Sequence, residues 1–245
     1  KVINIAERSA RTAMGLAIAM ALVGVLVGVA SLTGITMTIA DKIFGLSGGW
    51  MPAAVILTMI VAIILGMGVP TTPAYVLASI SAAPVLLRMG IPDIVAHMFV
   101  FYFAVMSALT PPVCTGAYTA AGLAGANPNK VGFTSLRLAL GGFVVPLIFI
   151  SHPSILLVEG YSIVNLVYIV SAIAVGLILI AAAFEGYMLA PITMFWRFVF
   201  FATAVLLVVP SIPAAACGWA MAITITFLHW KGSRNNAAEP VQQNH

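Results

Sequence analysis

Charged residues are scarce in this chain of 245 residues, in which Asp, Glu, Lys and Arg together make up 7%. Soluble domains carry about 25% charged residues, so the composition excludes an ordinary soluble globular protein. Hydrophobic residues make up 62% and occur in long continuous runs. Such runs favour membrane-spanning helices over a barrel of alternating ten-residue strands. The sequence therefore predicts an all-α polytopic membrane protein.

Residue types that carry catalysis or redox chemistry are also few. The two cysteines, Cys114 and Cys217, lie in apolar surroundings without Cys-x-x-Cys spacing, which favours packed small residues over a disulfide or metal pair. The sequence contains no Ser/His/Asp set, no metal-ligand cluster and no phosphate-binding loop. We therefore expect neither an enzyme nor an ATP-driven pump, and no cofactor. The cations lie beside apolar runs, where they set membrane orientation, so no nucleic-acid partner is expected.

The apolar runs divide the chain into successive segments. Residues 1–11 are expected to form a polar cytoplasmic lead, followed by a scaffold helix over 12–34 and an interfacial helix over 36–46. A hairpin over 50–89, a broken helix over 94–125 and a helix over 132–151 complete a block that ends at residue 155. Three further transmembrane helices are expected within 156–230 (at 163–184, 195–209 and 213–230), and a polar, disordered cytoplasmic tail at 231–245.

Two proline-bearing interruptions organise the chain. The first is Gly66-Met67-Gly68-Val69-Pro70-Thr71-Thr72-Pro73, which has an apolar arm of about sixteen residues on each side. Such an arm covers roughly 24 Å of a bilayer core of about 30 Å, which predicts a re-entrant hairpin. The second is Thr110-Pro111-Pro112-Val113-Cys114-Thr115-Gly116, which breaks the following helix. Bare backbone at membrane depth occurs where it is buried in protein or lines a wet cavity.

The distribution of cations supports the re-entrant hairpin. With residues 1–11 in the cytoplasm and the hairpin entering and leaving on one side, only Lys42 and Arg88 lie outside. The eight cations on the cytoplasmic side are then Lys1, Arg8, Arg11, Lys130, Arg137, Arg197, Lys231 and Arg234. This imbalance agrees with the positive-inside rule, whereas a hairpin that crossed once would spread the charges evenly.

The two interruptions offer the ligands that a dehydrated cation needs. A proline lacks the N–H that would bond the carbonyl four residues earlier, so the carbonyls of Gly66, Val69, Ser107 and Ala108 are predicted to be free. Carbonyls at the end of a half-helix suit Na⁺, and threonine hydroxyls add further oxygen ligands. The predicted cation-binding residues are Gly66, Gly68, Val69, Thr71, Thr72, Ser107, Ala108, Thr110 and Thr115.

The onward half-helices would serve an anion. They are expected to begin near Ala74 and Ala117, and their N-termini suit a carboxylate. The predicted substrate-binding residues are Pro70, Thr72, Ala74, Pro111, Pro112 and Gly116. The alternative for either interruption is that Gly and Pro simply kink a transmembrane helix. His97 could be a proton site, but a packed, hydrogen-bonded histidine is favoured, and Glu185 is favoured as an interfacial residue.

These motifs resemble the large membrane subunit of TRAP (tripartite ATP-independent periplasmic) transporters. The first interruption with Ala74-Tyr75 is similar to the hairpin tip of the second repeat in that family. The stretches His97–Phe103 and Thr110–Val113 resemble the following broken helix, and Ala121–Pro128 resembles its exit. The resemblance is greatest to the fused permease of the TAXI branch, and it covers residues 12–155. Pro73 and Cys114-Thr115-Gly116 depart from the family pattern.

The resemblance implies a secondary transporter of the bacterial inner membrane that imports a small organic anion with co-transported Na⁺, or with H⁺. A periplasmic solute-binding protein would deliver the anion. The implied fold, in the wider ion-transporter superfamily, has two inverted repeats moved as an elevator against a scaffold. This chain would be the C-terminal repeat of a longer permease, whose N-terminal repeat and small membrane subunit would be partners. A non-transporting membrane scaffold that docks a partner is the alternative, whereas an intramembrane enzyme lacks its catalytic set.

Overall fold

The computed structural model describes residues 2–158, 162–188, 190–209 and 212–238. Within them the regular structure is helical, apart from an isolated bridge between Tyr187 and Pro191. In chain order, the helices are α1 (Val2–Thr33), α2 (Ile35–Ser47), α3 (Met51–Gly66), α4 (Thr71–Arg88), α5 (Asp93–Met106), the 3₁₀ turn η1 (Ser107–Leu109), α6 (Thr115–Ala124), α7 (Pro128–Ser151), the 3₁₀ turn η2 (Pro153–Leu156), α8 (Ile163–Glu185), α9 (Met194–Val208) and α10 (Ile212–Ala238). The expectation of an all-α polytopic membrane protein is confirmed.

Three of these helices are long and apolar enough to cross a bilayer: Ile3–Thr33, Pro128–Ser151 and Ile163–Glu185. Shorter apolar helices lie at Met51–Gly66, Asp93–Leu109, Met194–Val208 and Ala216–Leu228. Both α3 and α5 fall into this shorter class, as expected for the arm of a hairpin and for a broken helix. Of the three spans expected after residue 156, only α8 is both long enough and apolar enough to cross a bilayer within the described residues.

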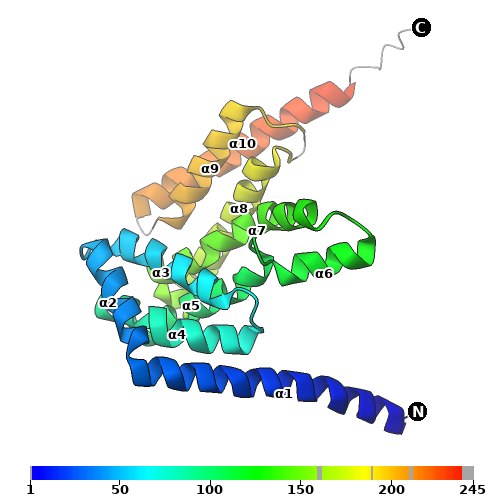
Figure 1. Ribbon diagram of the computed structural model, residues 1–245. Helices are drawn as coiled ribbons and strands as arrows, with labels where there is room; N and C mark the ends of the chain where they lie inside the picture. Colours follow the sequence, from blue (N-terminus) through cyan, green and yellow to red (C-terminus); the bar gives the residue numbers. More distant parts are fainter. Residues whose placement is uncertain (1, 159–161, 189, 210–211, 239–245) are drawn as a thin grey trace. The chain divides into compact units, whose positions relative to one another are not determined.

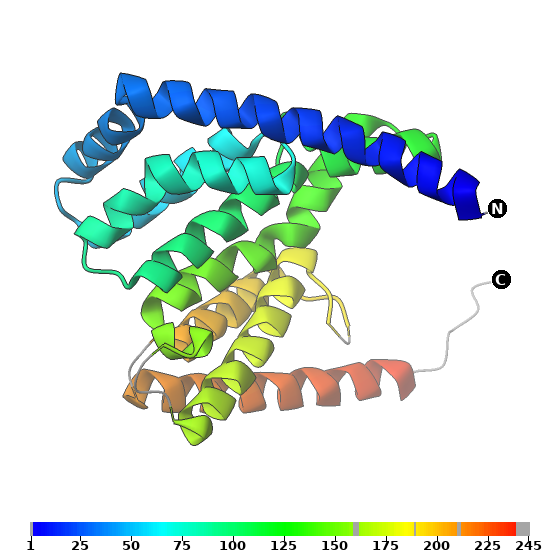
Figure 2. The same ribbon diagram turned by 90° about the horizontal axis from the view of Figure 1, so that it is seen from below.

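The chain divides into two compact units, residues 1–136 and 137–245, and the boundary falls inside α7. In the first unit α3, α4 and α5 all pack against one another, while α2 packs on α3 and α4. The helix α1 lies beside α4 and extends past it (Figures 1 and 2). In the second unit α9 packs against both α8 and α10.

Small side chains allow the close packing of α4. Ala74, Ala78 and Ala82 are completely buried and recur at one-turn intervals along the helix. Methyl groups let neighbouring backbones approach, which is how helices associate where lipid removes the hydrophobic driving force. At its far end, α4 is joined to α2 by an exposed ion pair between Arg88 and Asp41. The helix α2 is thereby attached to the end of α4.

Two predicted polar segments are helical instead. The lead at 1–11 was expected outside the first helix, but α1 begins at Val2, and Arg11 donates to Glu7 Oε1 over 3.0 Å. This pairing over four residues supports a helix in polar sequence. The tail was expected to be disordered from residue 231, yet α10 continues to Ala238. No proline interrupts it before Pro240, so the apolar part propagates into the polar part. Residues 239–245 lie outside the described residues.

The second unit is closed by an aliphatic and aromatic core. Its buried members come from α8, α9 and α10 and include Leu179, Ile180, Phe200 and Leu207. His152, which follows α7, hydrogen-bonds through Nε2 to the Val208 carbonyl at 2.9 Å. The end of α7 is therefore fastened to the end of α9.

Candidate functional site

The hairpin tip and the helix break, separated by some forty residues in sequence, meet in the first unit (Figure 1). Gly66, the last residue of α3, lies against the end of α5. A Cβ at this position would come within 2.6 Å of both the Ala104 carbonyl oxygen and Ser107 Oγ. Cβ atoms essentially never approach so closely, so the contact requires glycine at position 66. The structure brings together the predicted site residues Gly66 and Ser107.

A second contact joins the two interruptions further along. Gly68 has φ +75, a left-handed conformation that glycine adopts without a steric penalty. A Cβ there would lie 3.4 Å from Val113 Cγ1, in the middle of the break. The tip of the hairpin therefore rests on the end of α5 and on η1 at Gly66, and on the break itself at Gly68. The sequence predicted both interruptions, but it did not predict which residues of one would face which residues of the other.

The break is a short non-helical stretch between η1 and α6. Thr110 donates its N–H to the Ser107 carbonyl at 3.1 Å and its hydroxyl to the Met106 carbonyl at 3.0 Å. Its own carbonyl accepts the Cys114 N–H at 3.2 Å. The peptide bond between Pro111 and Pro112 is cis. The turns between the two half-helices are thus held by three groups of Thr110: its N–H, its hydroxyl and its carbonyl.

Two of the four carbonyls predicted to be free are engaged. The Ser107 carbonyl accepts the Thr110 N–H, and the Gly66 carbonyl accepts the Val69 N–H at 3.4 Å. That part of the prediction was wrong, because N–H groups three residues along the chain replace the ones that proline lacks. Among the described residues no hydrogen bond reaches the carbonyls of Val69 or Ala108. The Ala108 carbonyl instead lies 3.6 Å from the position that a Cβ of Gly116 would occupy.

The onward half-helices begin earlier than predicted. The helix α4 starts at Thr71 and not near Ala74, and α6 starts at Thr115 and not near Ala117. Thr71, Thr72 and Thr115 are exposed within these first turns, and neither helix has a side-chain cap. Ala74 is buried, and its N–H donates to the Pro70 carbonyl. The first N–H groups at the two N-termini therefore belong to Thr71 and Thr72 in α4, and to Thr115 and the two residues that follow it in α6.

Around the break, Tyr118 and Ala104 carried no distinctive signal in the sequence, whereas Cys114 was expected to be a packed small residue. Tyr118 places its hydroxyl 3.0 Å from the Pro112 carbonyl and 3.3 Å from Asn129 Oδ1. Cys114 is completely buried, and its sulfur lies 2.9 Å from where a Cβ of Gly132 would be. The start of α7 therefore packs against the break. Ala104, whose carbonyl faces Gly66, could not be found from sequence because its side chain has no role in the contact.

The side chain of His97 is hydrogen-bonded, as the favoured interpretation predicted. Its Nδ1 lies 3.0 Å from the Tyr75 hydroxyl, and the two rings contact edge to face. Tyr75 also contacts Phe101 with ring centroids 5.5 Å apart. This cluster links the start of α4, just after the hairpin tip, to α5. Within the described residues there is no group of three or more His, Cys, Asp or Glu side chains that could hold a metal ion.

The comparison with protein families gives a match over residues 1–160, to the family described as "Tripartite ATP-independent periplasmic transporter, DctM component". The matched residues include the hairpin, the break and all of α7. No significant match was found among curated proteins or among solved structures.

Proposed function

Because this chain belongs to the DctM family, the large membrane component of tripartite ATP-independent periplasmic transporters, we propose that it imports a small organic anion together with Na⁺. The observation that carries the proposal is the meeting of two interrupted helices at Gly66 and Ser107. Discontinuous helices that meet in this way are the sites at which secondary transporters hold ions and substrates. Membership of a transporter family also agrees with the expectation that the chain is not an enzyme.

The cation would be bound by oxygen atoms around this junction. The Val69 and Ala108 carbonyls have no hydrogen-bond donor among the described residues, so each can offer both lone pairs. Ser107 Oγ donates to the Ala104 carbonyl at 2.6 Å and keeps its own lone pairs for a cation. Hard cations such as Na⁺ prefer such neutral oxygens at the C-terminal ends of half-helices. The exposed hydroxyls of Thr71 and Thr115 would complete the ligand set.

The anion would bind at the N-termini of α4 and α6. The first turns of these helices carry N–H groups without intrahelical acceptors, and their dipoles favour negative charge. Thr72 at the start of α4 and Gly116 at the start of α6 are both exposed. A carboxylate near these residues would lie beside the co-bound cation, which couples the two binding steps. We place Pro70, Pro111 and Pro112 around this carboxylate as a rigid frame.

The partners follow from the name and chemistry of the family. A periplasmic solute-binding protein would deliver the anion, and the small membrane subunit and an N-terminal repeat would complete the permease in the bacterial inner membrane. The TAXI branch and the assignment of this chain to the C-terminal repeat are part of the same proposal. So is an elevator movement of the hairpin and the broken helix.

Na⁺ binding can be tested without knowing the substrate. Thermal unfolding of the purified full-length protein is compared in NaCl and in choline chloride at equal ionic strength. A ligand that binds the folded state stabilises it by about 2.7 kcal/mol at 100 times its Kd, so the unfolding midpoint should rise in NaCl only. Thr71→Ala and Thr115→Ala should reduce this shift. Thr134→Ala, which removes an exposed hydroxyl bonded to the Lys130 carbonyl on α7, should leave it unchanged.

Coupling is tested by uptake. The full-length protein with its partner subunits is reconstituted in liposomes and given a panel of labelled small carboxylates, with a Na⁺ gradient, a pH gradient or neither. Accumulation that requires the Na⁺ gradient supports the proposal, and accumulation that requires the pH gradient replaces Na⁺ with H⁺. Uptake that ignores both gradients rejects coupled transport, and no uptake with any carboxylate favours the scaffold alternative.

A further inference from the structure

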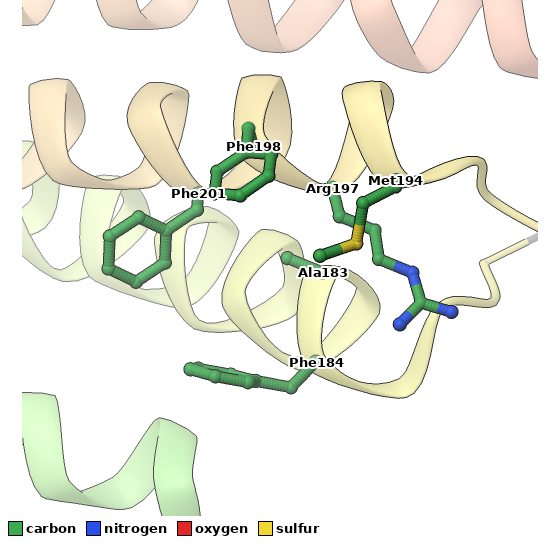
Figure 3. Close-up of a pocket in the computed structure, with 6 residues that line it drawn as sticks. All are labelled: Ala183, Phe184, Met194, Arg197, Phe198 and Phe201. Atoms are coloured by element: carbon green, nitrogen blue, oxygen red, sulfur yellow. The ribbon is translucent and has the colours of Figure 1, made fainter.

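The second unit contains an open pocket of about 320 Å³ between the end of α8 and the start of α9 (Figure 3). All but one of the side chains that line it are apolar: Ala183, Phe184, Met194, Arg197, Phe198 and Phe201. Phe184 of α8 and Phe201 of α9 meet edge to face across it, with ring centroids 6.2 Å apart. The pocket is therefore a hydrophobic surface with a single cation at one end.

That cation is half-buried and has no acidic partner. Arg197 Nε donates to the Ile192 carbonyl at 3.4 Å, but in the part of the chain that the structure describes no carboxylate lies within 4 Å of its guanidinium. A charged group beside apolar surface in a membrane protein is costly unless an anion compensates it. The remaining N–H donors of Arg197 are available to such an anion.

The backbone fixes the position of the guanidinium. Gly186, which follows α8, has φ +74, and a Cβ there would lie 1.8 Å from Arg197 Nη2. The turn that holds Gly186 is closed by the Ile192 N–H, which donates to the Gly186 carbonyl at 2.8 Å. Ile192 itself is buried in the core of the unit. Arg197 is therefore seated against main chain at the rim of the pocket, and a side chain at position 186 would displace it.

The neighbouring charges leave the pocket positive. Arg137 lies 3.5 Å from Glu185 and donates to the Phe184 carbonyl at 3.3 Å, so its charge is matched by a carboxylate and by the end of α8. Arg197 has no carboxylate partner of this kind among the described residues. The helix α9 begins beside it at Met194 without a side-chain cap, which adds the partial positive charge of a helix N-terminus.

We propose that this pocket binds an anionic phospholipid. The phosphate would accept hydrogen bonds from the Arg197 guanidinium, and an acyl chain would lie along Phe184, Phe198 and Phe201. The site is at the end of α8, a helix of spanning length, which is where headgroups meet a transmembrane helix. Arg197 also belongs to the cations predicted to face the cytoplasm, the side on which basic pockets between helices bind anionic headgroups. This inference does not depend on the proposed transport activity.

Native mass spectrometry of the full-length protein tests the proposal. The protein is presented with equal amounts of phosphatidylglycerol and phosphatidylcholine in mixed micelles. Both lipids carry a phosphate, but only phosphatidylglycerol has a net negative charge. Attraction of a basic residue to anionic lipid contributes about 1 kcal/mol, so we expect roughly fivefold greater retention of phosphatidylglycerol. Arg197→Gln should abolish this preference, and Arg197→Lys should keep part of it. Lys130→Gln, which removes an exposed cation outside the pocket, should keep all of it.

A second measurement does not require a variant to fold. Phosphatidylglycerol with a photoreactive group in its acyl chain should label peptides from residues 183–201 of the unmodified protein, and inorganic phosphate should not displace it. Labelling spread equally over all helices would overturn the proposal, as would displacement by inorganic phosphate alone. In the mass-spectrometry experiment, the proposal would be overturned if Arg197→Gln still preferred phosphatidylglycerol, or if Lys130→Gln lost that preference as completely as Arg197→Gln.

Discussion

Replacing Gly66 by alanine tests the contact on which the candidate site depends. In most helices this change is stabilising, because alanine exceeds glycine in helix propensity by up to about 1 kcal/mol. Here the new methyl group would lie 2.6 Å from the Ala104 carbonyl oxygen and from Ser107 Oγ. The carbonyl cannot rotate away, and overpacking of this kind costs about 1–3 kcal/mol. We therefore expect Gly66→Ala to destabilise the protein by up to about 2 kcal/mol.

Gly45→Ala is the matched control. Gly45 also lies within a helix of the first unit, but a Cβ there has nothing within 4 Å. This substitution should stabilise by about 0.5–1 kcal/mol, so the two variants should move in opposite directions. Thermal unfolding in detergent would detect the difference, since 1 kcal/mol shifts the midpoint by about 2–4 °C in a protein of this size.

The effect on transport should follow from the same displacement. Because the hairpin tip would be pushed off the break, Gly66→Ala should lose Na⁺-dependent uptake, whereas Gly45→Ala should keep it. Adding Ser107→Ala removes one of the two atoms in the way, so the double variant should be less destabilised than the sum of the single ones. If Gly66→Ala is as stable as Gly45→Ala and transports normally, the two interruptions do not meet as described.

Three further substitutions probe single interactions in the first unit. Thr58 is completely buried with no hydrogen-bond partner for its hydroxyl, so Thr58→Val should raise the free energy of unfolding by about 1 kcal/mol, measured by thermal unfolding; a decrease would show that the hydroxyl is in use. Tyr118→Phe removes the hydrogen bond to the Pro112 carbonyl and should cost about 1 kcal/mol in the same assay, unless the break is held by its other bonds. Arg88→Gln breaks the exposed ion pair with Asp41 and should cost less than about 1 kcal/mol, with a dependence on salt concentration; a larger loss would show that the pair is shielded from solvent.

The sequence was sufficient for the number and order of the helices near the site. Long apolar runs determine where helices form, and α3 and α5 begin and end within about three residues of the predicted positions. The predicted starts of α4 and α7 were three or four residues too late for a common reason. Pro73 and Pro128 were both left outside the predicted helices, but a proline in the first turn costs no hydrogen bond, because the N–H groups there have no intrahelical acceptor. Asn127 caps α7 by accepting the N–H groups of Asn129 and Lys130.

The contacts between the two interruptions could not be predicted from the sequence. Glycine and proline at positions 66–73 predicted that the chain turns, but not which residue of the break would face Gly66. That pairing depends on the register between α3 and α5, which is set by packing of apolar side chains along both helices. Carbonyl groups such as that of Ala104 belong to every residue type, so a site built from backbone oxygens leaves only an indirect trace. Hydroxyl-bearing residues and glycines in the sequence indicated the region of the site, whereas the positions of the backbone oxygens became known only from the structure.

The alanine stripe of α4 has a mechanical consequence. From Ala74 to Ala82 the buried alanines of α4 present a nearly flat surface to the neighbouring helices, whereas the branched Val85 and Leu86 are buried in its last turn. Packed helices that slide past one another must exchange rotamers wherever long side chains interdigitate, and methyl groups have none to exchange. Lengthwise shear of α4 therefore requires little repacking along these turns, and is resisted mainly in its last turn by Val85 and Leu86.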